Sequence, residues 1–343
     1  MNEPIFITGA TGLLGAHLLL ALRRNGHQVA ALKRPGSDLE PVRRVFGYAG
    51  AGDLLSEVRW VDGDLTDRIG LGDCLKGVRQ IYHCAGLVSF RRSDRQAMDR
   101  FNREGTANLV DASLEARVDK FLHVSSSSAI GSAPEGEEAD ERLIWSRKKD
   151  STAYAASKFA SEMEVWRGME EGLPAVIVNP TIILGPGFWD KGSSAIVHRV
   201  ARALRYATPG VTGFVGVWDV ARAMIRLMES DIQGERFLLN AENRSYRDVF
   251  EQVALALGRK QGFRPVSPGV LQLLARLDGL AETVTRTRRI TREQAGAAFS
   301  VSRYSNRKIT TCIDLTFEPL EDVIRETVRC YRMDFPLVPG TYA

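Results

Sequence analysis

The stretch TGATGLLG at residues 8–15 places three glycines at three-residue spacing, between two segments of different character. PIFIT at 4–8 is apolar and β-rich, whereas LLGAHLLLALRRNG at 13–26 carries apolar residues at helical spacing. Glycines at such a strand-to-helix turn let the backbone turn tightly, approach a pyrophosphate and press the helix onto the sheet. The free N–H groups and positive dipole of the helix N-terminus favour phosphate there. We therefore predict a dinucleotide site whose contacts in this turn are Gly9, Thr11, Gly12, Leu13 and Gly15.

The pattern continues through the first half of the chain. Further β-rich segments lie at 28–34, 58–65, 79–86, 119–126 and 174–180. Segments with helical periodicity separate most of them, the longest at about 94–117. Strands alternating with helices predict an α/β fold, a Rossmann doubly wound parallel sheet.

The pattern changes after Pro180, where a glycine-rich loop leads into mostly helical sequence with short strands at 213–217 and 235–240. We predict an NADP(H)-binding Rossmann domain over 1–180. Residues 181–343 are predicted to form a smaller, mainly helical substrate-binding region, with some segments returning to the sheet.

The bulk composition is that of an ordinary globular protein, with 343 residues, 44% apolar and 26% charged. The net charge of +4 is spread along the chain, and TRTRRITR at 285–292 is interpreted as a solvated helix face, so no nucleic-acid partner is expected. The apolar face of 270–284 is interpreted as core or as a lid over the pocket. The four cysteines form no C-x-x-C pair, which predicts reduced thiols in a cytoplasmic protein, and no metal site is expected. No apolar run approaches 18 residues, so no membrane association is expected.

The end of the second strand bears on the choice of dinucleotide. An acidic residue there would bind a ribose 2′-hydroxyl, whereas an arginine accommodates a 2′-phosphate. This chain has Lys33 and Arg34, with no acidic residue before Asp38. NADP(H) is therefore favoured, and NAD(H) is the alternative if both are merely surface residues.

Motifs along the first half follow a familiar order. They are TGATGLLG, GDL at 63–65, HCAG at 83–86, FNREGTANLVDAS at 101–113, VSSSSAIG at 124–131, YAASK at 154–158 and NPTIILGPG at 179–187. On these motifs, which cover about 5–187, the chain resembles the extended short-chain dehydrogenases/reductases. It looks most like the dihydroflavonol-reductase-like and 3β-hydroxysteroid-dehydrogenase-like branch, often labelled NAD-dependent epimerase/dehydratase. The later half matches only loosely.

Tyr154 and Lys158 support such chemistry by their spacing. Residues four apart lie on one face of a helix, which places the ammonium beside the phenol. A phenol with a pKa of about 10 is a poor acid or base near neutrality, and a nearby cation brings it closer to working pH. We predict that both residues act in catalysis and in cofactor binding.

The resemblance implies further site residues. Counting back five residues from Gly131 gives Ser126 as the serine that orients the substrate oxygen, with Ser127 as the alternative. Asn102 would act in a water chain that returns protons past Lys158. The remaining cofactor contacts implied by the resemblance are Asp64 and Leu65 at adenine, and Ala85, Gly86, Pro180 and Ile183 near the nicotinamide.

Departures from the family pattern narrow the reaction. The stretch Ser126–Ala129 lacks the acidic pair of the dehydratases, and AIG with Lys-Arg argues against many nucleotide-sugar epimerases. The prediction is an NADP(H)-dependent oxidoreductase that transfers hydride between the nicotinamide and a ketone, aldehyde or secondary alcohol. An NAD-dependent nucleotide-sugar epimerase and a non-catalytic dinucleotide-binding regulator remain as alternatives.

The substrate is left open by the sequence. Phe90, Phe188 and Trp189 would suit a flat apolar molecule, and Arg199 or Arg244 would suit a nucleotide-sugar. Relatives commonly dimerise through two long helices, here those that contain Asn102 and Tyr154, so the resemblance implies a homodimer.

Overall fold

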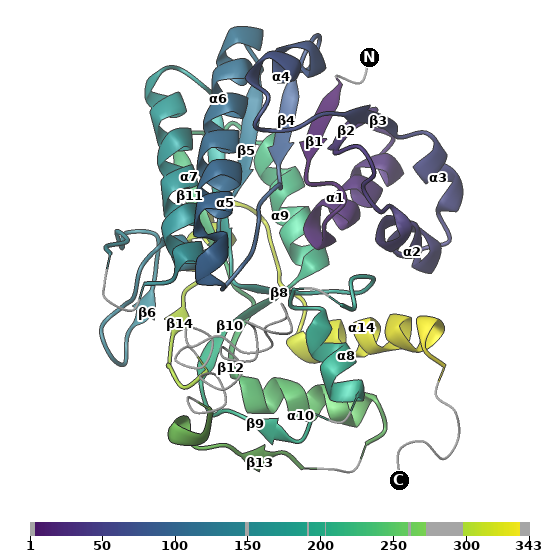
Figure 1. The fold of residues 1–343 in the computed structure, drawn as a ribbon, viewed down its shortest axis with the longest axis vertical. Helices are drawn as coiled ribbons and strands as arrows, with labels where there is room; N and C mark the ends of the chain where they lie inside the picture. Colours follow the sequence, from purple (N-terminus) through teal and green to yellow (C-terminus); the bar gives the residue numbers. More distant parts are fainter. Residues whose placement is uncertain are drawn as a thin grey trace.

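The computed structural model describes residues 4–147, 151–190, 192–202, 204–259, 262–271 and 298–336. A seven-stranded sheet lies at its centre, in the order β3-β2-β1-β4-β5-β7-β11 (Figure 1). The strands are β1 (Ile5–Thr8), β2 (Val29–Lys33), β3 (Arg59–Asp62), β4 (Gln80–His83), β5 (Lys120–Val124), β7 (Ala175–Pro180) and β11 (Glu235–Leu239). All neighbouring pairs are parallel, with Ile5 opposite both Val29 and Gln80. The predicted doubly wound sheet is confirmed.

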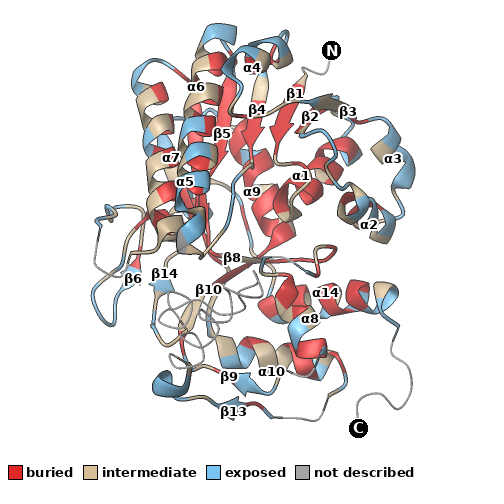
Figure 2. Cartoon of the chain, in the orientation of Figure 1, coloured by how far each residue is buried: buried red, intermediate tan, exposed pale blue. Residues whose placement is uncertain are grey.

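Helices cover both faces of this sheet. One face carries α1 (Leu13–Arg24), α2 (Glu40–Tyr48), α3 (Gly52–Ser56) and α9 (Val217–Glu229). The other carries α4 (Arg68–Cys74), α6 (Gly105–Ala116) and α7 (Ala153–Glu170). The inner strands are consequently buried from both sides (Figure 2), which explains their nearly continuous apolar sequences, whereas the edge strand β3 is half-buried to exposed.

The long helical segment expected at about 94–117 is interrupted in the structure. A short 3₁₀ turn (Arg92–Asp94) and α5 (Arg95–Met98) lead into a π-helix (Asp99–Glu104), and regular α-helix resumes only with α6. The Thr106 hydroxyl donates to the carbonyl of Asn102, while the Asn102 side chain bonds the loop after β4. A π-turn adds a residue to the helix and often marks a functional position.

Residues after β7, together with the short strand β6, build a second layer beyond the carboxyl ends of the sheet strands (Figure 1). Its strands are β8 (Ile182–Leu184), β10 (Val211–Gly216) and β12 (Glu242–Ser245), with the short pairs β9 (Tyr206–Ala207) with β13 (Arg264–Pro265) and β6 (Glu138–Ala139) with β14 (Arg303–Tyr304). Its helices are α8 (Ala195–Ala201), α10 (Tyr246–Ala256) and α14 (Leu320–Asp334). They share a second core around Trp189, Phe214 and Ile324.

Three later segments return to the Rossmann layer. Helix α9 packs against α1 through buried residues such as Val220, β11 forms the edge strand beside β7, and α13 (Arg307–Cys312) contacts β11. The predicted boundary at residue 180 thus divides the sequence into two regions, but parts of the second region pack against the first.

Two sequence interpretations fall almost entirely outside the described residues. Of the apolar segment 270–284 only Val270 and Leu271 are described, and none of the basic stretch 285–292 is. Within the part of the chain that the structure describes, no helix has the length and apolar character needed to cross a membrane.

Candidate active site

The glycine turn is packed so tightly that two of its glycines have no room for a side chain. Gly9 has a φ of +73°, and a Cβ atom there would lie 2.5 Å from the backbone nitrogen of Ala85. A Cβ on Gly15 would lie 2.2 Å from the carbonyl oxygen of Gly9. Gly12 differs, because a Cβ would meet only that same oxygen, at 3.3 Å. The close backbone packing of the turn therefore requires glycine at positions 9 and 15. At Gly12 the absence of a side chain instead leaves open space in front of the turn.

The start of α1 has the character of a phosphate site. Gly12 is the N-cap and provides no side-chain cap, and the first turn contains no acidic residue. The N–H groups at the beginning of a helix need partners from outside it, and phosphate oxygens satisfy them. Thr11 and Leu13, both half-buried, flank this position. These features fit the pyrophosphate of a dinucleotide.

The two basic residues after β2 have different surroundings. Lys33 lies opposite Asp62 in the β2–β3 pairing and forms an ion pair with it. Arg34 is exposed, and its guanidinium carbon lies 5.8 Å from the centre of the Phe101 ring. Hence Lys33 is already neutralised within the protein, whereas the Arg34 charge faces an aromatic ring.

Asp64 lies close to a second arginine that the sequence did not single out. Its carboxylate accepts two hydrogen bonds from Thr66, from the backbone nitrogen and the hydroxyl, each at 2.8 Å. These bonds lower the pKa of Asp64 against the opposing effect of burial, and the charges of Arg34 and Arg100 lower it further. Arg100 was missed because it belongs to the π-helix, and only the fold places that helix beside β2. Leu65 is buried against Gly105.

Three of the predicted catalytic residues lie together at the carboxyl ends of β5 and β7. The Thr152 hydroxyl accepts from the Ala155 nitrogen at 2.9 Å and caps α7, so that Tyr154 lies in the first turn and Lys158 one turn later. The side chain of Ser126 lowers the pKa of the Tyr154 phenol, against the larger effect of burial. Of the two serines left open by the sequence, Ser126 is thus the one that acts on Tyr154, whereas Ser127 acts on the pKa of Tyr304.

Burial sets the electrostatics of this group. It raises the pKa of Tyr154, which the side chain of Ser126 partly counteracts. Burial lowers the pKa of Lys158 to about 8, against the opposing charge of Glu162. The Lys158 ammonium donates to the carbonyl of Val124 at 2.7 Å. A Cβ on Gly86 would lie 3.6 Å from this nitrogen, so glycine there keeps space beside the amine.

Glu162, one turn beyond Lys158, is a second residue that sequence reasoning missed. Its carboxylate is fully buried and accepts from Ser125 at 2.7 Å, Asn179 at 2.8 Å and Arg236 at 2.8 Å. The Asn179 amide also donates to the Ser126 carbonyl at 3.1 Å. One buried ion pair therefore ties the ends of β5 and β7 to α7 and to β11. Its spacing of four residues from Lys158 was visible in the sequence, but its partners were not.

Asn102 has well-defined partners in the π-helix. Its amide donates to the Leu87 carbonyl and to the Ser157 hydroxyl, both at 3.0 Å, and its side-chain oxygen accepts from the Leu87 nitrogen at 2.7 Å. The side chain thus joins the loop after β4 to the first turns of α7. Its part in a proton relay stays a prediction.

The positions predicted beside the nicotinamide lie in or just after strands. Ala85 lies two residues after β4 and its nitrogen donates to the Thr8 hydroxyl at 3.3 Å, and Pro180 is the buried last residue of β7. Ile183 lies in β8, where its carbonyl accepts from the Ser193 hydroxyl. Their contacts with a cofactor stay predictions.

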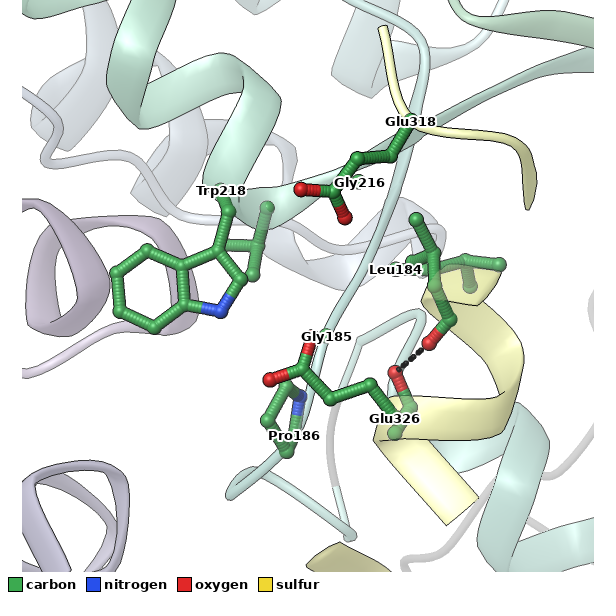
Figure 3. A pocket seen from close by; sticks show the side chains of 10 residues that line it. Leu184, Gly185, Pro186, Gly216, Trp218, Glu318 and Glu326 are labelled. Atoms are coloured by element: carbon green, nitrogen blue, oxygen red, sulfur yellow. Dashed lines mark hydrogen bonds between the residues drawn. The ribbon is translucent and has the colours of Figure 1, made fainter. Parts of the chain in front are cut away.

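The structure separates the residues considered for the substrate. Phe90 lies near Tyr154, with ring centres 5.9 Å apart. Trp189 is instead buried edge-on against Tyr331, and Arg244 is paired with Glu242. Trp218 packs against His17 and lines a narrow crevice together with Glu318 and Glu326 of the C-terminal segment (Figure 3). This crevice lies between β8, β10 and α14, and none of the residues that line it belongs to the Ser126–Tyr154 group.

Among the residues that the structure describes, no group of three or more histidine, cysteine or acidic side chains could hold a metal ion.

Known proteins share this architecture. The model of the NAD dependent epimerase/dehydratase family matches residues 5–239. Sterol demethylase protein B of Methylococcus capsulatus is 33% identical over 275 residues, which cover 79% of this chain and 80% of that protein. A putative dihydroflavonol 4-reductase of Synechocystis is 30% identical over 75% of this chain and 74% of its own. The crystal structure of gox2253 superposes with a TM-score of 0.81 and 28% identity, covering 98% of this chain and 100% of that one.

The family model spans more than half of the chain, and the first of these relatives matches most of its length. Reductases and dehydrogenases are among the relatives in the branch that the motifs indicated. The chain belongs to the NAD-dependent epimerase/dehydratase family of extended short-chain dehydrogenases/reductases, and is an enzyme of the class that acts on CH–OH and C=O groups.

Proposed function

We propose that this enzyme is an NADP(H)-dependent oxidoreductase that interconverts a ketone or aldehyde and the corresponding alcohol. The observation that carries the proposal is the grouping of Ser126, Tyr154 and Lys158 at the carboxyl ends of β5 and β7, with the open glycine turn on the same edge of the sheet. The bound cofactor supplies the hydride, and the protein supplies binding, orientation and a proton.

The protein side of the reaction follows from the two hydroxyls. In the reducing direction, Ser126 donates a hydrogen bond to the carbonyl oxygen and thereby orients it, while Tyr154 releases its proton to the same oxygen. Burial keeps the tyrosine protonated until then, because it raises the pKa of Tyr154. Lys158 lies one helical turn from Tyr154, and its positive charge favours the phenolate that forms on Tyr154 when the proton leaves. In the oxidising direction the same proton moves back.

We propose that Arg34 selects the phosphorylated cofactor, with Arg100 as a second phosphate contact. Neither arginine has an ion-pair partner among the residues that the structure describes, and both are exposed. Their charges converge near Asp64, which we propose to bind adenine, with Leu65. The ion pair of Lys33 with Asp62 supports a smaller role for Lys33. Gly9, Thr11, Gly12, Leu13 and Gly15 would bind the pyrophosphate, and Ala85, Gly86, Pro180 and Ile183 the nicotinamide.

A fluorescence titration with NADPH and NADH under identical salt conditions tests this assignment. One charge-assisted contact favours NADPH by at least about tenfold. Arg34→Ala should remove most of that preference, whereas Lys33→Ala, the matched control, should largely retain it. Equal binding of the two cofactors by the unaltered protein would exclude selection by Arg34 and favour an NAD-dependent reaction.

We also propose an assembly state and a compartment. A homodimer would form through α7 and through the π-helix with Asn102 and its continuation α6, which lies beside α7 on one face of the sheet. Light scattering coupled to size-exclusion chromatography tests it, and a monomer mass at all concentrations would refute it. We propose further that the enzyme is cytoplasmic and that its partner is a small-molecule substrate.

A further inference from the structure

A buried histidine bridges two elements of the Rossmann layer. His83 is the last residue of β4, and its ring is bonded on both sides: Nδ1 lies 2.7 Å from the hydroxyl oxygen of Thr8, and Nε2 lies 2.9 Å from that of Thr106. All three side chains are buried. Burial and, to a smaller extent, the charge of Lys158 lower the pKa of His83 to about 3, so the ring is neutral near pH 7. His83 thus joins the last residue of β1 to the first turn of α6.

The direction of each bond in this chain follows from its neighbours. The Thr106 hydroxyl donates its only proton to the carbonyl of Asn102 at 2.5 Å, so it can only accept from His83. Nε2 of the neutral ring therefore carries the proton, and Nδ1 is an acceptor. The Thr8 hydroxyl donates to Nδ1 and accepts from the nitrogen of Ala85 at 3.3 Å. Every group between Ala85 and Asn102 is used, and the neutral histidine is the one member that both accepts and donates through a rigid ring.

One end of this chain of bonds reaches the glycine turn. Thr8 directly precedes Gly9 in the sequence. The nitrogen of Ala85, which donates to Thr8, is the atom that a Cβ on Gly9 would meet at 2.5 Å. The end of β4 and the start of the glycine turn are therefore packed against each other, and both are bonded to His83 through the Thr8 hydroxyl.

The other end is the carbonyl of Asn102, in the π-helix Asp99–Glu104. The neighbouring ring of Phe101 lies 5.8 Å from the Arg34 guanidinium. The Asn102 amide donates to the Ser157 hydroxyl at 3.0 Å, which in turn donates to the carbonyl of Tyr154 at 2.8 Å. A shift of the π-helix relative to β4 would thus displace the ring beside Arg34 and loosen the support of Tyr154 at the same time.

We propose that His83 is a positioning residue for hydride transfer: it fixes the π-helix relative to the glycine turn, and so keeps Arg34 and the first turn of α7 in register with one bound cofactor. This inference rests on the proposed function, which supplies the roles of Arg34 and Tyr154. His83 acts through Thr106 and Asn102 rather than by contact with the reacting atoms. Breaking its bond to Thr106 should therefore lower the preference for NADPH and kcat together.

Thr106→Val tests this link, because valine keeps the branched shape of threonine and removes the hydroxyl. We expect kcat with NADPH and the ratio of NADPH to NADH affinity each to fall by about three- to tenfold, the range of one hydrogen bond. Thr106→Ser retains the hydroxyl and should restore both. Thr327→Val is the matched control: its buried hydroxyl likewise donates to the carbonyl four residues earlier, at 2.7 Å, but in α14. It should lower Tm to a similar extent and leave both ratios unchanged.

A second variant separates the link from a loss of packing. His83→Asn keeps an acceptor oxygen where Nδ1 faces Thr8, but it has no donor long enough to reach Thr106. It should reproduce the losses of Thr106→Val, and the double variant should show no further loss, because both substitutions break the same bond. Losses that add, or a fall in kcat with the NADPH preference intact, overturn the inference, as does a Thr106→Val protein with both quantities unchanged.

The two measurements also keep this inference apart from the proposed function. Fluorescence titration with NADPH and NADH needs no turnover, so it decides the link even in a protein that reduces no ketone. If the unaltered protein reduces a ketone without preferring NADPH, selection by Arg34 fails, and the comparison of kcat between Thr106→Val and Thr106→Ser still decides the link.

Discussion

The two ends of the proposed site are built in different ways. The dinucleotide end depends on one short stretch, residues 8–15, whose glycines contact each other and the backbone after β4. The catalytic end gathers Ser125, Glu162, Asn179 and Arg236 from segments far apart in the chain. A site formed by neighbours in sequence keeps its geometry wherever a strand meets a helix, whereas one formed by distant segments depends on the whole packing. Changes at the two ends should therefore have different consequences.

The largest effect is expected where distant segments meet beneath the catalytic group. Glu162→Gln removes the charge that faces the largely buried Arg236, and leaving one member of a buried ion pair unpaired costs about 3–5 kcal/mol of the free energy of unfolding. Denaturant unfolding measures it. Glu164→Gln on the same helix is the control: this residue pairs with Arg167, which also bonds Asp111 and Glu171, so a loss below about 1 kcal/mol is expected. Equal effects of the two substitutions would contradict a special role for the buried pair.

Tyr154→Phe should separate chemistry from cofactor binding. Loss of the phenolic proton lowers kcat by about 10² to 10⁴, the usual contribution of a positioned acid or base. The affinity for NADPH should fall far less than kcat, because Tyr154 is only one of the proposed cofactor contacts and the glycine turn is untouched. Tyr48→Phe, whose hydroxyl bonds Asp334 outside this group, serves as control. Unchanged turnover in Tyr154→Phe would remove the tyrosine from the mechanism, and absence of turnover in the unaltered protein would favour the regulator alternative.

The glycine turn offers a contrast within eight residues. Gly15→Ala forces a Cβ into the Gly9 carbonyl and should destabilise the protein by about 1–3 kcal/mol, as overpacking does. Gly12 has φ −101° and ψ 171°, which alanine adopts readily, so Gly12→Ala should leave stability nearly unchanged. Its methyl group should nevertheless weaken NADPH binding, since it enters the space left for the pyrophosphate. Thermal unfolding and NADPH titration measure the two effects. Intact affinity in Gly12→Ala would place the phosphates elsewhere.

The pH dependence of reduction gives the smallest effect. The pKa of Lys158 is lowered to about 8, so the ammonium is charged below that pH and loses its charge above it. With the charge lost, the phenolate of Tyr154 is less favoured, and kcat for reduction should fall as the pH rises through about 8. In Glu162→Gln this decline should begin at lower pH, because Glu162 raises the pKa of Lys158. A decline that stays in place would show that another group titrates.

Much of the framework was predictable because its signals are local. Six strands of the sheet were found from apolar β-rich runs, and the spacing of Tyr154 and Lys158 indicated one helix face. The break before α6 was not predictable. The π-helix accompanies contacts of Asn102 with Leu87 and Ser157, and hydrophobic periodicity does not indicate such contacts. Arg100 was overlooked for the same reason.

The sequence by itself determined the dinucleotide turn and the order of strands and helices, since hydrophobic periodicity and glycine conformation act between near neighbours. Only the tertiary structure decided that Asp62 neutralises Lys33, that Glu162 meets Arg236, and that Ser126 and Ser127 act on different tyrosines. Such contacts join residues far apart in the chain. They arise from strand register and from the packing of helices on the sheet, which a linear pattern does not specify.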